Sequence, residues 1–478
     1  MEIVIGKFLT IFKEISAIPR CSKHEEAICK WLCDWAEEHK FACKQDKAGN
    51  IVITVPATPG YEDSPIVVLQ GHTDMVCEKL PESDHDFATD AIRPIRQGDW
   101  LVADKTTLGA DNGVAIALAL MLVEEQKPHP QLELLFTVDE ETGLTGANQL
   151  GKDFLQGKIL LNLDSEGEGK FTIGCAGGKH TIIHLPLEYD LAAESSNFLK
   201  LKVHGLLGGH SGVDINKNHG SALKLLARSL YLLKEEFSFN IADILGGTAH
   251  NAISRDAECT ICIYPDDQAA IEEFVETIKL AFRHEYTGIE PGLEITIEPE
   301  DSIKDILTEE STLQVINLLM ALPHGVSAMT LSIPDLVETS CNLAKVEIES
   351  DSLRVLISIR SSVSSRLEGL CGRIISIGDL AGAEVEESDG YPAWEPDTNS
   401  DLLKLCTSCY QKLFGIEPDV LIIHAGLECG LIGEKYPDME MISFRPTIQN
   451  AHSPRERLNL PSFQRTWEFL AILLEEMR

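Results

Sequence analysis

Apolar and polar residues recur along the chain with two periods, one typical of helices and one of strands. Near the start, Ile11, Ile15 and Ile18 lie three or four positions apart, which predicts a helix ending before a proline. A second helix is expected to follow, begun by a capping box in which Ser22 and Glu25 bond each other's backbone amides. The start of the chain is therefore predicted to form two helices.

Strands and helices then alternate. The predicted strands are 51–55, 66–69, 132–138 and 159–163, with a nearly all-apolar helix at 113–122. The runs 66–69 and 159–163 are too continuously apolar for strands exposed on one face, so both are expected inside the sheet. This pattern is typical of an α/β fold.

The pattern changes near residue 185. Strand-like segments are predicted at 198–204, 257–264, 293–298 and 353–360, with helices at 218–236, 268–284 and 311–321. This proportion suggests an α+β module. Turn residues at 388–396 mark a second boundary, after which the pattern predicts a helix at 399–414, a strand at 419–423 and a helix at 461–477. We expect one domain, 1–185 and 393–478, interrupted by another at 186–392.

The charge balance narrows the possible partners. The 478 residues include 40 Lys and Arg against 76 Asp and Glu, a formal net charge of −36. Such acidity argues against nucleic acid or an anionic membrane surface as partner, since both attract basic proteins. No apolar run approaches the roughly 20 residues that span a bilayer, and the start of the chain carries no signal-peptide pattern.

The cysteines form no recognisable framework. There are thirteen, an odd number, and in a chain of this length we interpret them as reduced thiols of a cytoplasmic protein. Cys259 and Cys262 lie in a strand-like run, where residues three apart face opposite ways, and Cys406 and Cys409 lie in an apolar helix. Neither pair is expected to bind metal.

Acidic and imidazole groups follow several predicted strands of the first segment. The residues are His72, Asp74, Glu140, Glu141 and Asp164, together with Asp111 just before the apolar helix. In open α/β sheets, sites assemble at the carboxyl ends of the strands. Alone, each residue is equally well explained as a turn acid, a helix cap or a solvated corner. Their joint occurrence makes that explanation much weaker.

Clustered carboxylates repel one another unless cations neutralise them. A mixture of imidazole and carboxylate suits Zn²⁺, Mn²⁺ or Co²⁺ better than Ca²⁺ or Mg²⁺, and two ions with a bridging carboxylate would activate a shared water. His72 and Asp74 are two positions apart, so one can bind metal while the other orients it. Of Glu140 and Glu141, one need face the metal, which leaves the other as general base. No serine-hydrolase elbow, phosphate-binding loop or His-Glu-x-x-His motif occurs.

In order, the motifs resemble the M20 family of co-catalytic metallopeptidases, and within it the aminoacylhistidine dipeptidase branch. The matching segments are Phe12–Arg20, Gln70–Glu78, Thr107–Gly113, Asp139–Gly143, Asn162–Glu166 and His424–Gly430. The resemblance implies a zinc-peptidase-like catalytic domain with a central mixed sheet, interrupted by an inserted α+β lid and dimerisation domain. It also implies two divalent ions, with Zn²⁺ favoured over Co²⁺ or Mn²⁺, and a homodimer.

The resemblance implies a role for each site residue. Asp111 would bridge the two ions, His72 and Asp164 would complete one metal site, and Glu141 and His452 the other. Asp74 would orient His72, and Glu140 would move the proton. A cis peptide bond is implied between Asp111 and Asn112.

The inserted domain would contribute the remaining residues. By resemblance, His210 would polarise the scissile carbonyl, and Asn251, Arg360 and His424 would contact substrate. An Arg fork suits a C-terminal carboxylate. The alternative for His210 is a histidine in a glycine loop without a local metal partner. Ser254 stands where the family usually has proline, which leaves the shape of that loop open.

The function implied is hydrolysis of Xaa-His dipeptides, such as β-Ala-His, by a metal-bound hydroxide. The alternatives are another M20 activity (a broad dipeptidase, a tripeptidase or an N-acyl amino-acid hydrolase) and a non-enzymatic M20-like binding protein. The intact Glu140 and the complete ligand set argue against the last, because a degenerate scaffold usually loses such residues.

Overall fold

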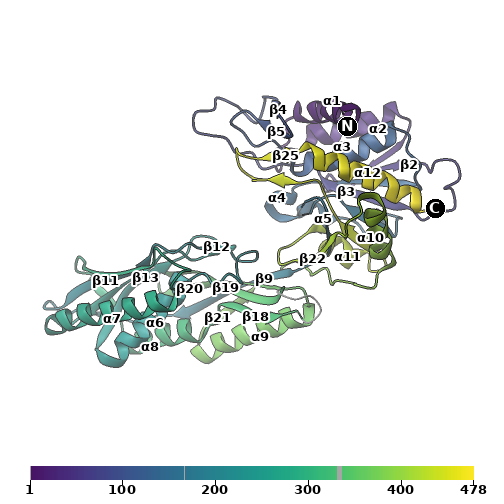
Figure 1. The fold of residues 1–478 in the computed structure, drawn as a ribbon. Helices are drawn as coiled ribbons and strands as arrows, with labels where there is room; N and C mark the ends of the chain where they lie inside the picture. The colour runs from purple at the N-terminus through teal and green to yellow at the C-terminus, as the bar shows by residue number, and fades with distance from the viewer. Residues whose placement is uncertain (1, 166, 331–335) are drawn as a thin grey trace. The chain divides into compact units, whose positions relative to one another are not determined.

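The computed structural model describes residues 2–165, 167–330 and 336–478. The chain divides into two compact units (Figure 1). Unit 1 comprises Met1–Cys175, Trp394–Ile422 and Leu427–Arg478, and unit 2 comprises Ala176–Ala393 and Ile423–Gly426. Glu166, at the end of the predicted Asn162–Glu166 segment, lies outside the described residues. No helix in the described ranges is both long enough and apolar enough to span a bilayer.

An eight-stranded mixed sheet forms the centre of unit 1. Its strands, in spatial order, are β1 (Ala42–Gln45), β2 (Ile51–Val55), β6 (Leu132–Thr137), β3 (Val67–His72), β7 (Ile159–Asn162), β23 (Glu440–Ser443), β8 (Lys170–Cys175) and β22 (Asp419–Ile423). β3 runs parallel to both β6 and β7. β1, β2 and β6 pair antiparallel in turn. The predicted interior position of the runs 66–69 and 159–163 is confirmed, as is the mixed α/β sheet.

Unit 1 also contains helices. They are α1 (Glu2–Ser16), α2 (Glu26–Glu38), α3 (Ala110–Glu124), α4 (Glu140–Gly143), α5 (Thr145–Gln149), α10 (Asp401–Phe414), α11 (Glu428–Lys435) and α12 (Leu460–Glu476). Of these, α2, α3, α10 and α11 pack directly against the eight-stranded sheet. All residues of α3 from Ala110 to Val123 are buried, as expected of a helix that is apolar on every side. A smaller sheet contains β4 (Pro94–Gln97), β5 (Trp100–Ala103), β24 (Ile448–Gln449) and β25 (Arg457–Asn459).

The predicted capping box at the start of α2 is wrong. Glu25 is the N-cap and its side chain makes no capping bond. Ser22 Oγ instead donates to Asp74 Oδ2 at 2.8 Å, and Glu25 Oε1 accepts the backbone amide of Asp139 at 2.9 Å. Ser22 and Glu25 therefore bond groups that follow β3 and β6. The Asp74 carboxylate and the Asp139 amide are buried, and buried polar groups need hydrogen-bond partners.

Unit 2 contains a nine-stranded sheet whose described pairings are all antiparallel. Its strands are β16 (Glu294–Pro299), β11 (Asn197–His204), β15 (Ala257–Ile263), β13 (Phe239–Gly246), β19 (Val337–Glu349), β20 (Ser352–Ser361), β9 (Gly177–Pro186) and β21 (Glu384–Glu387), with β18 (Gly325–Met329) beside β19. Two short pairs lie apart: β10 (Tyr189–Leu191) with β17 (Asp305–Leu307), and β12 (Gly209–His210) with β14 (Ala252–Ile253).

One face of the unit 2 sheet is covered by helices (Figure 1). They are α6 (Ala222–Glu236), α7 (Gln268–Glu285), α8 (Glu309–Ala321) and α9 (Ser364–Ala381); a short 3₁₀ helix spans Pro265–Asp267. On β20, Ile357 and Ile359 are fully buried members of the core beneath these helices. Because side chains alternate along a strand, Ser358 and Arg360 point to the opposite, helix-free face.

The passage from unit 1 to unit 2 lies at β9, which pairs with β20 in the second sheet. The predicted bounds 1–185, 186–392 and 393–478 assign most of this strand to the first segment. Where the chain leaves and re-enters unit 1, Cys175 and Trp394 form an antiparallel bridge with hydrogen bonds of 3.0 and 3.1 Å. The two ends of the long insertion are therefore adjacent.

Candidate functional site

The acidic and imidazole residues of the first segment meet at the carboxyl ends of the parallel strands in unit 1. Four groups have candidate ligand atoms within 4.8 Å of one another: His72, Asp111 and Asp164; Asp111, Glu141 and His452; His72, Glu140 and Glu141; and Glu25, Asp74 and Asp139. Asp111 belongs to the first two groups. This is the arrangement that a carboxylate bridging two cations requires.

Each ligand candidate comes from a different element. His72 ends β3, and its Nε2 lies 3.6 Å from Asp111 Oδ1 and 3.7 Å from Asp164 Oδ2. His452 lies in the loop between β24 and β25, and its Nε2 is 3.0 Å from Glu141 Oε2 and 3.6 Å from Asp111 Oδ2. The site therefore joins strand ends, a helix start and a loop more than 300 positions away in sequence.

Burial and mutual repulsion act on the carboxylates. Burial, then the charge of Asp111, raises the pKa of Asp164 to about 6. Burial likewise raises the pKa of Glu140 well above its ordinary value, with added repulsion from Asp164. Burial opposes ionisation of Asp111 too, but Arg445, His452 and His72 outweigh it and hold the pKa of Asp111 well below its usual range.

The donor set fits divalent cations. Glu141 Oε1 is a buried carboxylate oxygen without a hydrogen-bond partner among the described residues. Buried oxygens of this kind are rarely left unpaired in proteins, unless an ion or water occupies the space beside them. Two imidazoles and three carboxylates are ligands suited to zinc, cobalt or manganese.

Asp74 holds three of the site's groups in place. Its Oδ1 lies 3.1 Å from His72 Nδ1 and accepts the backbone amide of Glu140 at 3.1 Å. Its Oδ2 accepts the backbone amide of Glu141 at 3.2 Å, as well as the Ser22 hydroxyl. Burial disfavours the Asp74 anion, but His72 and these bonds outweigh it and lower the pKa of Asp74 to about 2.

The peptide bond between Asp111 and Asn112 is cis, which confirms the conformation implied by the family resemblance. The side chain of Asn112 donates to Leu163 O at 2.9 Å and to Asp164 Oδ1 at 3.0 Å. A Cβ on Gly71 would clash with Asn112 Oδ1. Glycine at that position therefore lets β3 approach the start of α3 closely.

Three charged residues that support the site were not predicted. Arg445 Nη1 donates to Asp111 Oδ1 at 2.7 Å and to Asp164 Oδ1 at 2.8 Å. Glu456 accepts the backbone amides of Leu108, Gly109 and Asp111 at 2.7–3.1 Å. Arg20 is the third. Single charges outside any motif give no sequence signal, although Arg20 ends the family-like segment Phe12–Arg20.

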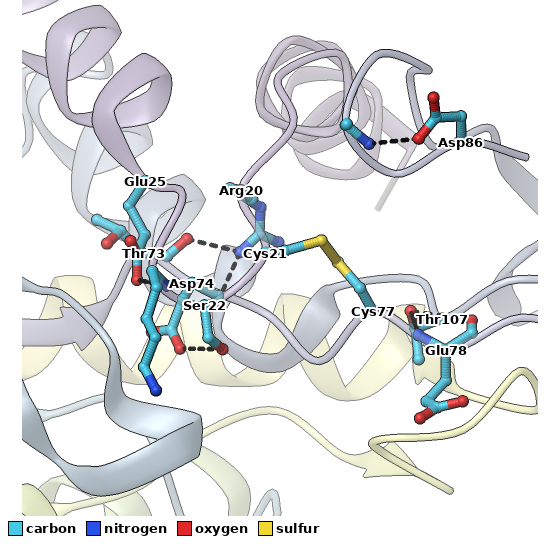
Figure 2. Close-up of a disulfide and its surroundings, with 12 residues drawn as sticks. Arg20, Cys21, Ser22, Glu25, Thr73, Asp74, Cys77, Glu78, Asp86 and Thr107 are labelled. Carbon is cyan, nitrogen blue, oxygen red and sulfur yellow. Dashed lines mark hydrogen bonds between the residues drawn. A yellow bond between two sulfur atoms is a disulfide. The ribbon is translucent and has the colours of Figure 1, made fainter.

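Arg20 and a disulfide fasten the edge of the site (Figure 2). The buried Arg20 guanidinium donates to Thr73 O and Asp74 O at 2.9 Å, and also to Gly109 O. Cys21 and Cys77 form a disulfide with a Cα–Cα distance of 5.7 Å. The prediction that all thirteen cysteines are reduced is therefore wrong for this pair. A backbone bridge between Cys21 and Met75 brings together two cysteines that are 56 positions apart in sequence.

The other eleven cysteines are free thiols. Cys259 and Cys262 are buried free thiols in β15, and Cys406 and Cys409 are buried free thiols in α10. Burial raises the pKa of all four thiols. None belongs to a group of three or more candidate metal ligands within the described ranges.

The four predicted substrate-contacting residues all lie in unit 2. His210 Nδ1 accepts the amides of Gly212 and Val213 at 3.2 and 3.1 Å, so the ring proton sits on Nε2 and can be donated. Burial, followed by the charge of Arg360, lowers the pKa of His210. Asn251 is exposed and its carbonyl accepts the amide of Ser211 at 2.8 Å.

Arg360 and His424 are both buried. His424 Nε2 lies 2.7 Å from Ser340 Oγ, and burial, then the charges of Arg360 and His210, lowers the pKa of His424 to about 3. Arg360 Nη1 donates to the Tyr391 hydroxyl at 2.6 Å. Ser254, at the family's proline position, contacts Ser221 Oγ at 3.0 Å and accepts the Leu223 amide, which anchors the start of α6.

Comparison with known proteins shows which family and which solved structures the chain is similar to. Residues 68–476 match the model of Peptidase family M20/M25/M40. The cytosol non-specific dipeptidase of Escherichia coli K12 is 40% identical over 468 residues, covering 98% of this chain and 96% of the relative. The solved aminoacylhistidine dipeptidase from Vibrio alginolyticus has 38% identity and a TM-score of 0.91, covering 99% of this chain and 97% of its own. Human carnosine dipeptidase 1, at 12% identity and TM-score 0.52 over 100% and 97%, shares the fold.

Proposed function

The chain belongs to peptidase family M20/M25/M40, and we propose that it is a metal-dependent dipeptidase acting on Xaa-His dipeptides, β-Ala-His among them. The observation that carries the proposal is the pair of three-residue groups that share Asp111. The resemblance in sequence and structure to the two dipeptidases, over nearly the whole chain, supports the substrate class.

His72, Asp111 and Asp164 would hold one divalent ion, and Asp111, Glu141 and His452 a second. We favour Zn²⁺, with Co²⁺ or Mn²⁺ as alternatives, because both groups combine imidazole with carboxylate. When bound, such ions polarise the scissile carbonyl and lower the pKa of the attacking water. Asp74 keeps His72 oriented, since it fixes the proton of the imidazole on Nδ1.

Glu140 is proposed as the general base. Its amide is held by Asp74, next to the Glu141 amide, so the adjacent carboxylates are fixed at a shared turn. One of them serves as ligand, which leaves the Glu140 carboxylate to take the proton of the attacking water and return it to the leaving amine.

Unit 2 would supply substrate recognition. The His210 Nε2–H is a donor suited to the carbonyl oxygen that becomes negative during attack. Arg360 is the group suited to a C-terminal carboxylate, with Asn251 and His424 as further contacts. We also propose that residues 1–185 and 393–478 form the catalytic domain and that 186–392 form a lid and dimerisation domain.

We further propose a cytoplasmic homodimer whose partners are small peptides, not nucleic acid or membrane. The Escherichia coli relative is called a cytosolic enzyme, which supports the location. Exposed apolar residues on two of the unit 2 helices, Leu380 of α9 and Leu313 of α8, support the lid as the surface between two copies. Sedimentation equilibrium of the full chain, with Leu380→Asp as variant, tests the dimer.

One assay separates this proposal from its rivals. The purified protein is stripped with chelator, reloaded with Zn²⁺, Co²⁺ or Mn²⁺, and given β-Ala-His, non-histidine dipeptides, tripeptides and N-acetyl amino acids. Hydrolysis restricted to dipeptides and restored by metal is expected. Hydrolysis of all dipeptides alike indicates a broad dipeptidase, and preference for tripeptides or acyl amino acids indicates another M20 activity. Metal binding without hydrolysis of any of them would indicate a binding protein.

A further inference from the structure

The helix-free face of the unit 2 sheet carries a row of polar residues around Arg360. Across the strands, Arg360 is paired with Ser340 of β19 on one side and with Gly178 of β9 on the other. Paired residues of neighbouring strands share a face, so all three open onto the side that the helices leave bare. His424 reaches the same place through its contact with Ser340.

Arg360 is a buried cation that is paired with no carboxylate of residues 2–165, 167–330 and 336–478. Its exposed fraction is 8%, and its Nε has no hydrogen-bond partner among those residues. Its charge lowers the pKa of His210, His424 and His180, in each case after burial as the larger cause. A buried, uncompensated charge is costly, and an incoming carboxylate would relieve it. The function proposed above assigns that carboxylate to the C-terminus of the dipeptide.

Tyr391 is the residue that holds this guanidinium. Its backbone is fixed to β9 by two hydrogen bonds with Gly178, 2.9 and 3.0 Å long. Its ring lies between two glycines: a Cβ on Gly178 would be 2.6 Å from the ring, and one on Gly426 would be 2.8 Å from it. Gly390 precedes it with φ +70°, and a Cβ there would clash with Gly178 O.

These contacts leave the Tyr391 ring little freedom, since backbone and ring are both constrained. The hydroxyl is directed at Arg360 Nη1, 2.6 Å away. A guanidinium is planar. Its plane is therefore set by two points: the attachment of Arg360 to β20 and the Tyr391 hydroxyl that accepts from Nη1. The orientation of the guanidinium is then fixed, as bidentate carboxylate binding requires.

We infer that Tyr391 is a positioning residue for substrate specificity: it orients Arg360 so that the guanidinium takes the C-terminal carboxylate of the dipeptide. The inference rests on the proposed function. Gly178 and Gly426 contribute to this orientation, because the absence of a Cβ at both positions leaves space for the Tyr391 ring. The activity would therefore require a free carboxyl terminus and would discriminate against peptide amides.

Tyr391→Phe tests the inference, because it keeps the ring between the glycines and removes only the hydroxyl. We expect KM for a dipeptide to rise on the order of tenfold, the loss typical of a hydrogen bond to a charged group, with kcat within about twofold. The corresponding dipeptide amide should show no such change. Tyr264→Phe, at an exposed tyrosine of the same unit, is the matched control. In an Arg360→Ala background, Tyr391→Phe should have no further effect.

The inference is overturned if Tyr391→Phe weakens acid and amide equally, if it lowers kcat with KM unchanged, or if its effect persists in the Arg360→Ala background. Calorimetry with free histidine and with histidinamide provides a readout that does not require turnover. Wild type should prefer histidine and Tyr391→Phe should lose most of that preference. If the protein hydrolyses no dipeptide but this difference appears, only the proposed function fails; if the preference is unchanged, the role of Tyr391 is refuted.

Discussion

His72 Nδ1 lies 3.1 Å from Asp74 Oδ1, and the other ring nitrogen, Nε2, lies 3.6 Å from Asp111 Oδ1 and 3.7 Å from Asp164 Oδ2. The same carboxylate accepts the amides of Glu140 and Glu141. One buried aspartate thereby couples the orientation of a metal-ligand candidate to the position of the proposed base.

Replacing Asp74 should therefore weaken metal binding as well as catalysis. In Asp74→Asn the amide cannot accept all the bonds that the carboxylate accepts, and His72 loses its ionic partner. We expect affinity for Zn²⁺ to fall about 10–100-fold, the range seen when such supporting groups are removed. Competition with a fluorescent chelator measures this affinity. The exposed Asp34→Asn is the control, and unchanged affinity in Asp74→Asn would refute the orienting role.

The adjacent glutamates should separate chemistry from metal binding. Glu140→Ala is expected to lower kcat at least 10²–10⁴-fold, the contribution typical of a general base, while metal content stays near normal. Glu141→Ala should lose bound metal, because His452 and Asp111 then lack their carboxylate partner. Metal analysis beside steady-state kinetics distinguishes the two. Wild-type kcat in Glu140→Ala would disprove the assignment of the base.

Glu456 should be important for the stability of the fold. Its buried carboxylate accepts three backbone amides that precede and begin α3, including that of Asp111. Glu456→Ala leaves these amides unpaired, at about 1–3 kcal/mol each where no water replaces the carboxylate. Urea denaturation of the metal-free protein should show a destabilisation of several kcal/mol. A change below about 0.5 kcal/mol would contradict the anchoring role.

The thiol count tests the disulfide. The protein unfolded without reductant should react at eleven cysteines, and after reduction at thirteen, because only Cys21 and Cys77 are joined. Thiol titration with a chromogenic disulfide reagent gives both numbers. In a Cys21→Ser, Cys77→Ser double variant, the count should be eleven with or without reductant. Thirteen reactive thiols in the unreduced wild type would exclude the bond in solution.

His424 should make stability depend on pH. Its folded pKa is about 3 because it is buried and lies near Arg360 and His210, against about 6.5 in an unfolded chain. Between these values the unfolded state binds more protons, so the stability contribution is complete above pH 6.5 and is lost as the pH falls towards 3. The loss is at most about 1.4 kcal/mol per pH unit. Between pH 7 and pH 5.5, the free energy of unfolding of the wild type should fall more than that of His424→Gln, as denaturant titrations of both proteins would show. An equal fall in both proteins would contradict the prediction.

The fold was predictable where the run of apolar residues fits only one kind of buried element. The apolar runs of β3 and β7 identified interior strands, and the all-apolar helix α3 was found to be buried on every side. The candidate ligands were predictable because the carboxyl ends of parallel strands meet. Less was predicted in unit 2, where α9 and the long strand β19 were not identified. Candidate site residues that lie in short motifs at strand ends can be predicted from one sequence.

The remaining site residues depend on contacts distant in sequence. Ser22 and Glu25 match a capping box locally, but buried partners on β3 and β6 compete for their side chains. Tyr391 and Arg445 lie in segments with turn or coil character, and nothing local indicates which charge they will meet. Cys21 and Cys77 could be paired only once the Cys21–Met75 bridge was known. Long-range pairing, rather than propensity, decides such positions.

The bridge between Cys175 and Trp394 makes the long insertion modular. Because its two ends are hydrogen-bonded neighbours, a turn of a few residues could join them in place of the 218-residue segment Ala176–Ala393. A gene could therefore gain, lose or exchange this segment with little rearrangement of unit 1 at the junction, although Ile423–Gly426 of unit 2 would stay behind. Apart from His424, the residues proposed to recognise substrate could then evolve separately from those proposed to bind metal.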